Sequence, residues 1–231
     1  ASRRALAAIQ EPARLRVPAY RRALWGRPRA VDGARSYDEI GDVVRTSSYA
    51  FRVVETPGHS PDHISLFEPE QRWLFSGDAF IGGEERAWSR ETDLFGVLSS
   101  LRTLASLRPE RLFPGSGNVR YTPLPVIHAK IKWLTGLART VAALETQGAS
   151  VSEMVAELLD ITPQDMTFRL WTGGHFSPAH LIEACRSYNA LMVPELTAPG
   201  PVASDAPSDE DEEDWADPSA PQSTDRDDVL R

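Results

Sequence analysis

Alternating apolar and polar residues predict short β-strands in the first half of the chain. Residues 51–55 follow this alternation and stop at Thr56-Pro57-Gly58, a run that breaks strands. Two further apolar runs, 64–67 and 73–75, are separated by turn-forming residues and so predict a hairpin. A fourth run lies at 111–113. We therefore expect these runs to pair in a sheet.

Apolar residues at helical spacing predict helices around and after these strands. The helix at 93–107 collects its leucines on one face, which should cover one side of the sheet. In the last predicted helix, Ser177 is suited to the N-cap and Pro178 to the first helical position. The predicted helices are 3–10, 93–107, 125–144, 153–159, 163–171 and one that starts at Ser177-Pro178.

Two polar residues that can bind metals follow the predicted strands. His59 lies in the loop after strand 51–55, and Asp78 comes directly after strand 73–75 and the flexible Ser76-Gly77. The order strand–His, hairpin, strand–Asp brings an imidazole and a carboxylate to one end of a sheet. Such a pair suits zinc or a similar first-row ion.

The loops that hold these two residues resemble those of the metallo-β-lactamase superfamily, in particular hydrolases of the glyoxalase II and ribonuclease Z kind. The family's TPGH(S/T) loop, with its metal-binding histidine, matches Thr56-Pro57-Gly58-His59-Ser60. Its (S/T)GD loop, whose aspartate bridges two metals, matches Ser76-Gly77-Asp78. The resemblance implies an α/β fold: part of an αββα sandwich, followed by a small helical C-terminal region and a disordered acidic tail.

One family motif is missing from this sequence. The principal ligand cluster, HxHxDH, precedes these loops in the family, and none of the five histidines here forms such a cluster. We expect the chain to be the C-terminal part of a longer protein, with residues 20–26 resembling the connector between the two halves. The alternative is a natural protein that has lost its metal site. Truncation would leave one apolar face of the sheet bare, with poor stability as the consequence.

A second departure concerns the loop after strand 111–113. In the hydrolases that this chain resembles, that strand ends in Pro-Gly-His-Gly, and the histidine binds the second metal. Ser116 occupies the histidine position here, and a neutral hydroxyl is a poor zinc ligand beside imidazole. His128 is the next imidazole in sequence, but a surface or capping role suits it better. We expect a second metal to bind weakly or with other ligands.

The resemblance also suggests roles for the neighbouring residues. His59 would bind the first metal, and Asp78 would bridge the metals and have the catalytic role of holding the hydroxide. His63 would orient the site from outside the coordination sphere, with Asp62 either orienting His63 or serving as a turn residue. His175 and His180 flank Ser177-Pro178 and could face the site, although a loop histidine and a first-turn histidine are the simpler interpretation.

Charge is distributed unevenly along the chain. Residues 194–231 contain twelve acidic residues and two arginines, a balance of −10, which leaves +2 for residues 1–193 out of the total of −8. Rich in Pro, Ser and Ala, this tail cannot bury enough apolar surface to fold, and we predict that it is disordered. We divide the chain into residues 1–122, the C-terminal half of a metallo-β-lactamase-like domain, 123–193, a helical region, and the tail, 194–231.

Nine arginines and two acidic residues lie in the first 36 positions. Three prolines interrupt any amphipathic helix there, and no aromatic platform accompanies the charge, which argues against a nucleic-acid arm. No apolar run is long enough to span a membrane. The lone Cys185 excludes an internal disulfide and is expected to be a small core residue.

We therefore expect the complete protein to be a cytoplasmic, zinc-dependent hydrolase of a small ester, thioester or related bond. One or two zinc ions would bind the complete protein, and this chain alone would bind zinc weakly or not at all. The alternatives are a non-catalytic scaffold of the same fold and a ribonuclease Z-like nuclease. Substrate, metal identity and oligomeric state are not determined by these patterns.

Overall fold

A five-stranded sheet forms the centre of the fold. The structure is a computed structural model, which describes residues 1–37 and 42–192. The strands are β1 (Val43–Arg45), β2 (Ala50–Glu55), β3 (Ile64–Glu68), β4 (Trp73–Gly77) and β6 (Arg111–Pro114). They lie in the order β1-β2-β3-β4-β6, with antiparallel pairing except for the parallel pair β4–β6. As a result β2, β4 and β6 run in one direction and end at the same edge of the sheet. The predicted strands are present, and the short β1 was not predicted.

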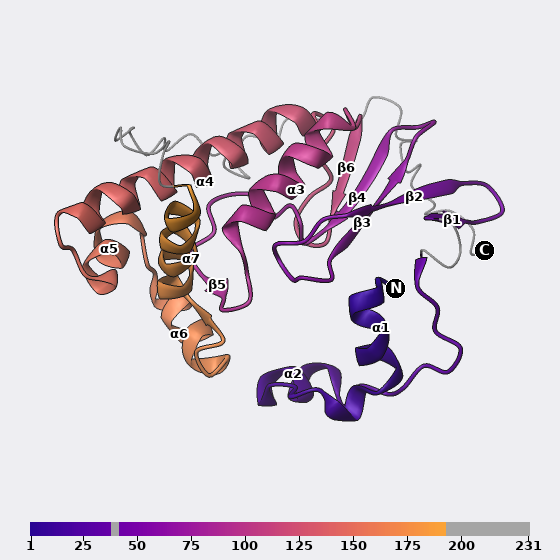
Figure 1. The fold of residues 1–231 in the computed structure, drawn as a ribbon, viewed down its shortest axis with the longest axis horizontal. Coiled ribbons are helices and arrows are strands. Elements are labelled where there is room, and N and C mark those ends of the chain that lie inside the picture. Colours follow the sequence, from indigo (N-terminus) through magenta and orange to yellow (C-terminus); the bar gives the residue numbers. More distant parts are fainter. Residues whose placement is uncertain (38–41, 193–231) are drawn as a thin grey trace, which may run out of the picture.

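One face of the sheet is covered by α3 (Leu94–Ser106) and α4 (Pro123–Thr146). Helix α3 starts at Asp93, whose side chain accepts hydrogen bonds from the N–H groups of Phe95 and Gly96. Leucines that α3 and α4 turn inward pack on Leu74 of β4 and Leu112 of β6, which are fully buried. In Figure 1, α4 extends from beside β6 to the C-terminal helices and so joins the two ends of the fold.

Three further helices follow α4: α5 (Val151–Leu158), α6 (Pro163–Trp171) and α7 (Pro178–Leu191). Ser150 and Thr162 each begin a helix with a capping box, as the sequence pattern suggests. Ser177 occupies the N-cap position of α7 and Pro178 the first helical position, as predicted, although the Ser177 side chain makes no capping hydrogen bond. Residues 176–177 also form strand β7 (Phe176–Ser177), which pairs with β5 (Trp88–Ser89).

The opposite face of the sheet carries partly exposed aromatic side chains. Phe75 and Phe113 stack with ring centroids 4.6 Å apart, and Phe51 meets Phe75 edge-on at 5.6 Å. Tyr49 and Trp73 extend this row, and Tyr49 is 40% exposed. These rings form an apolar sheet face without a complete cover, as was predicted.

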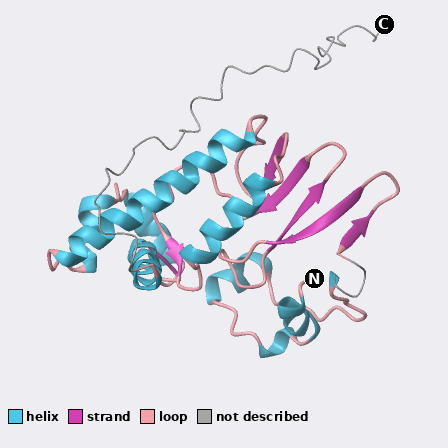
Figure 2. Ribbon diagram, turned by 45° about the horizontal axis from the view of Figure 1, so that its top comes forward, coloured by secondary structure: helices cyan, strands magenta, loops and turns pink. Residues whose placement is uncertain are grey.

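The first residues form α1 (Arg3–Gln10), a 3₁₀ turn (Pro12–Arg14) and α2 (Ala19–Trp25). Figure 2 shows these short helices apart from the layer of α3 and α4. The Arg4 guanidinium donates to the carbonyl of Pro61 at 2.9 Å, which ties α1 to the loop after β2. Residues 20–26 were expected to be a connector, and most of them are helical. The acidic tail predicted at 194–231 lies outside the described residues.

Candidate metal centre

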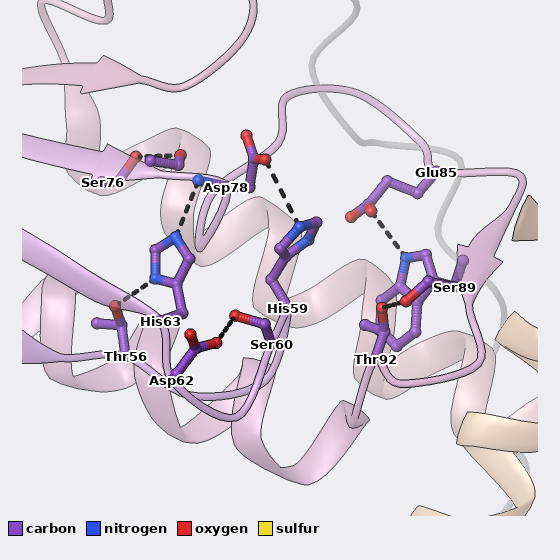
Figure 3. A network of polar contacts seen from close by, with 12 residues as sticks. Thr56, His59, Ser60, Asp62, His63, Ser76, Asp78, Glu85, Ser89 and Thr92 are labelled. Carbon is purple, nitrogen blue, oxygen red and sulfur yellow. Dashed lines mark hydrogen bonds and ion pairs between the residues drawn. The ribbon is translucent and has the colours of Figure 1, made fainter. Parts of the chain in front are cut away.

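His59 and Asp78 meet at the edge where β2 and β4 end. The loop after β2 carries His59, and Asp78 directly follows β4. Figure 3 shows the two side chains facing one another, with His59 Nε2 3.5 Å from Asp78 Oδ2. Both are partly open to solvent, with 29% and 44% of the side chains exposed. The predicted pair is therefore brought together by the parallel direction of its two strands.

The separation of the two donor atoms suits a shared metal ion. Two donors bound at ~2.0–2.2 Å to one tetrahedral ion lie roughly 3.3–3.6 Å apart. The observed 3.5 Å between His59 and Asp78 falls in this range. Within residues 1–37 and 42–192, however, no group of three His, Cys, Asp or Glu side chains is placed to hold a metal. The pair can therefore supply two of the four ligands that a zinc site usually has.

His63 lies behind this pair and uses both ring nitrogens within the protein. Its Nε2 accepts from the backbone N–H of Asp78 at 3.2 Å, which leaves the proton on Nδ1, 2.8 Å from Thr56 Oγ1. Thr56 then donates to Ser65 Oγ at 2.9 Å, and Ser65 donates to the carbonyl of Ser76 at 3.2 Å. Each polar group in this series of hydrogen bonds has a partner, so the series fixes the Ser76-Gly77-Asp78 loop against the loop after β2.

Burial lowers the pKa of His63, and the neighbouring His59 acts in the same direction. The hydrogen bond from the Asp78 N–H requires a neutral His63 imidazole, because only an unprotonated ring nitrogen can accept it. Asp62 accepts instead from Ser60 Oγ at 2.7 Å. Of the two roles considered for Asp62, the structure agrees with that of a turn residue. The hydrogen-bond partner of His63 is Thr56, which was not predicted.

Ser116 follows the end of β6 and is exposed, one residue beyond a close contact with Asp78. The backbone N–H of Gly115 donates to the carbonyl of Gly77 at 2.9 Å, and a Cβ at Gly115 would lie 2.5 Å from Asp78 Oδ1. His128, in contrast, lines a hollow with Arg72, Glu110 and other residues at the starts of β4 and β6. His128 is thus at the wrong edge of the sheet to replace the missing histidine.

The helical C-terminal region contacts β5 and the residues that follow it. His180 Nδ1 lies 3.1 Å from the carbonyl of Trp88. His175 Nε2 lies 3.4 Å from the guanidinium of Arg21 and 3.8 Å from Glu91. Burial lowers the pKa of His175, and Glu91 only partly opposes this effect. Both histidines are held by neighbours, so neither is placed as a ligand.

Comparisons with known proteins agree with this geometry. The profile of the metallo-β-lactamase superfamily matches residues 7–116. The "Beta-lactamase-like protein 2 homolog" of Drosophila melanogaster is 28% identical over 142 residues, which cover 62% of this chain and 47% of that protein. "Hydroxyacylglutathione hydrolase GloC" of Haemophilus influenzae is 33% identical over 70 residues, 30% of this chain and 33% of that one.

Two further similarities are informative. "Thioesterase pkgB" of Emericella nidulans is 35% identical over 78 residues, which cover 34% of this chain and 22% of that protein. A beta-lactamase domain protein from Burkholderia ambifaria has a similar fold, with a TM-score of 0.52 at 21% identity over 73% of this chain and 49% of the other. The matched segment, residues 7–116, is thus identified as part of a metallo-β-lactamase superfamily domain.

The chain spans about half, or less, of the length of the curated relatives it matches. None of the helices in residues 1–37 and 42–192 is long and apolar enough to cross a membrane.

Proposed function

We propose that the complete protein is a metal-dependent hydrolase of a small ester, thioester or related bond, with zinc as the metal. The observation that carries this proposal is the 3.5 Å separation of His59 Nε2 and Asp78 Oδ2 at the shared end of β2 and β4. The names of two relatives, a hydroxyacylglutathione hydrolase and a thioesterase, favour a thioester. We expect the reaction to take place in the cytoplasm, where a lone thiol such as Cys185 stays reduced.

His59 and Asp78 would hold the metal, together with ligands that the described residues do not provide. When bound, the ion would supply Lewis acidity, which activates water at neutral pH and polarises a carbonyl group. His63 would keep Asp78 in place through the N–H of Asp78, and the buried hydroxyls of Thr56 and Ser65 would fix the tautomer of His63. The partner would be a small molecule that enters at the solvent-exposed side of Asp78.

A non-catalytic scaffold is the second candidate, and one observation favours it: among the described residues the metal pair lacks a third ligand. With two ligands, this chain alone is expected to bind zinc more weakly than micromolar and to hydrolyse esters negligibly. Tight, stoichiometric zinc binding by the 231-residue chain in calorimetry would show that other residues complete the site.

Zinc binding and thioester hydrolysis, measured on the complete protein, test the proposal directly. Asp78→Asn and His59→Ala should each reduce kcat/KM by more than about a hundredfold, since loss of an outer partner alone costs about 10- to 100-fold. His128→Ala is the matched control, because this histidine is exposed at the other edge of the sheet. Hydrolysis that survives both site variants would contradict the proposed site, and a complete protein without zinc or turnover would favour the scaffold.

A further inference from the structure

The segment between Asp78 and helix α3 is attached at both ends to the loops that carry His59 and Asp78. This bridging loop, residues 79–92, begins directly after Asp78. At its other end the N–H of Asp93 donates to the carbonyl of Gly58 at 2.8 Å, and Gly58 precedes His59. A shift of the bridging loop would therefore act on Asp78 through the chain and on His59 through this hydrogen bond.

A buried lysine of α4 holds the middle of the bridging loop. Lys130 is 4% exposed, and its Nζ donates to the carbonyl of Gly83 at 2.8 Å and lies 2.8 Å from Glu85 Oε1. The ammonium also lies 4.8 Å from the centre of the Trp133 ring. Lys130 thus binds two residues of the loop from a position 47 residues after Gly83 in the chain.

The contact continues from Glu85 toward the C-terminal helices. Glu85 Oε2 accepts from the indole N–H of Trp88 at 2.7 Å, and Figure 3 draws this contact in the same view as the His59–Asp78 pair. Trp88 is buried and begins strand β5, and its carbonyl lies 3.1 Å from Nδ1 of His180. One ion pair therefore fixes both the loop and the β5–β7 contact beside the site.

Stability does not account for a buried pair of this kind. Desolvation of two charges can exceed their mutual attraction, and apolar pairs of similar volume are often as stable or more stable. Removing one partner, in contrast, is strongly destabilising, because the remaining charge stays buried without compensation. The Lys130–Glu85 pair therefore favours the position of the bridging loop that keeps the two charges together.

We propose that Lys130 is a positioning residue for the His59–Asp78 metal pair, acting through Glu85 and the bridging loop. The proposal rests on the proposed metal-dependent hydrolysis for its consequence in activity. Its structural part, the coupling of Lys130 to the two ends of the loop, stands on the contacts in this chain alone.

Lys130 and Lys132 are the two lysines of the chain, which permits a direct check of the burial. Brief acetylation of the folded 231-residue chain should modify the exposed Lys132 and spare Lys130. Glu85→Gln should increase modification of Lys130, since it removes the charged partner. Equal modification of both lysines in the unsubstituted chain would overturn the proposal.

The deciding variants are Lys130→Met, which leaves Glu85 unpaired, and the double substitution Lys130→Met with Glu85→Leu, which makes the contact apolar. Lys132→Met is the matched control on the same helix. We expect the single variant to lower Tm and the double variant to recover it. In both, hydrogen exchange should become faster in residues 78–93 and in 57–63, at unchanged exchange in the centres of α3 and α4.

In the complete protein, zinc affinity and kcat should fall about tenfold in both variants, with KM changing little. A purely structural role predicts that the double variant recovers zinc affinity and kcat together with Tm, and that result would overturn the proposal. Unchanged exchange at 78–93 and 57–63 would overturn it as well. If the unsubstituted complete protein bound no zinc, the proposed function would fail, and the exchange measurement would still decide the coupling.

Discussion

His63 accepts a hydrogen bond from the backbone N–H of Asp78 at 3.2 Å, so that one imidazole joins the ends of two strands. Gly77 makes this contact possible, because its φ is +51° and a Cβ there would lie 2.8 Å from His63 Nε2. His59, with 29% of its side chain exposed, faces solvent and Asp78. Two histidines four residues apart thus have different partners: His59 faces the carboxylate of Asp78, and His63 binds its backbone N–H.

Replacing His63 with phenylalanine should loosen Asp78 without removing a metal donor. The N–H of Asp78 loses its acceptor, and Thr56 loses the Nδ1 proton. In the complete protein we expect zinc affinity to fall by about 10- to 100-fold. A zinc titration measures this effect, with His128→Phe as the control. Unchanged affinity in His63→Phe would show that the loop keeps its position without the imidazole.

Position 116 should accept a histidine that restores a second metal site. β6 and the Pro114-Gly115 turn bring the preceding residue next to Asp78, since a Cβ at Gly115 would lie 2.5 Å from Asp78 Oδ1. In the complete protein, Ser116→His should raise the metal content toward two ions per chain, measured by elemental analysis.

Substitution by alanine separates the roles of the two side chains at this edge. Asp78→Ala should cost far more activity than Ser116→Ala, because the carboxylate is a charged donor and the hydroxyl is neutral. Loss of turnover in Ser116→Ala at unchanged metal content would instead assign the serine a role in catalysis or substrate positioning.

Gly58→Ala should destabilise the chain strongly. Gly58 has a φ of +139°, and an added Cβ would lie 2.3 Å from the backbone nitrogen of Val97, which α3 holds in place. We expect the free energy of unfolding to fall by about 4 kcal/mol or more. Gly117→Ala is the control: its φ is +86°, and nothing lies within 4 Å of the added Cβ, so backbone strain of about 1–2 kcal/mol is expected. Similar losses in urea unfolding of both variants would contradict the close contact.

Cys185 should report the global unfolding of the chain. Its side chain is fully buried, and burial raises the pKa of the thiol to about 12 from 9.0. Since the thiolate is the reactive form, this shift alone slows reaction with a disulfide reagent by about a thousandfold at pH 8. Labelling should therefore follow the unfolded fraction across a urea titration. Fast, complete labelling of the folded chain would show that α7 opens locally.

Local sequence patterns were sufficient for most elements and for the meeting of His59 and Asp78. Helix α3 was predicted because its leucines recur at helical spacing, and the structure places its start at Leu94, directly after the N-cap Asp93. His59 and Asp78 could be predicted to meet because each follows a strand, and strands that run in one direction end at one edge. These signals lie within about twenty residues of one another, where backbone geometry limits the alternatives.

The tertiary structure decided what depends on distant segments. Strands β5 and β7 are each two residues long, and the paired residues Ser89 and Phe176 are 87 positions apart in the chain. No local sequence pattern therefore predicts that they pair. Asp62 and Thr56 were equally available in sequence as partners of His63, and the pairing of β2 with β3 places Thr56 opposite the ring. In the sequence Lys130 is only a polar residue within an amphipathic helix. Its contacts with Gly83 and Glu85 are visible only in the tertiary structure. Such partners are selected by the packing of segments that lie far apart in the chain. The free energy of these contacts is gained only when the whole core forms, so no local pattern reveals them.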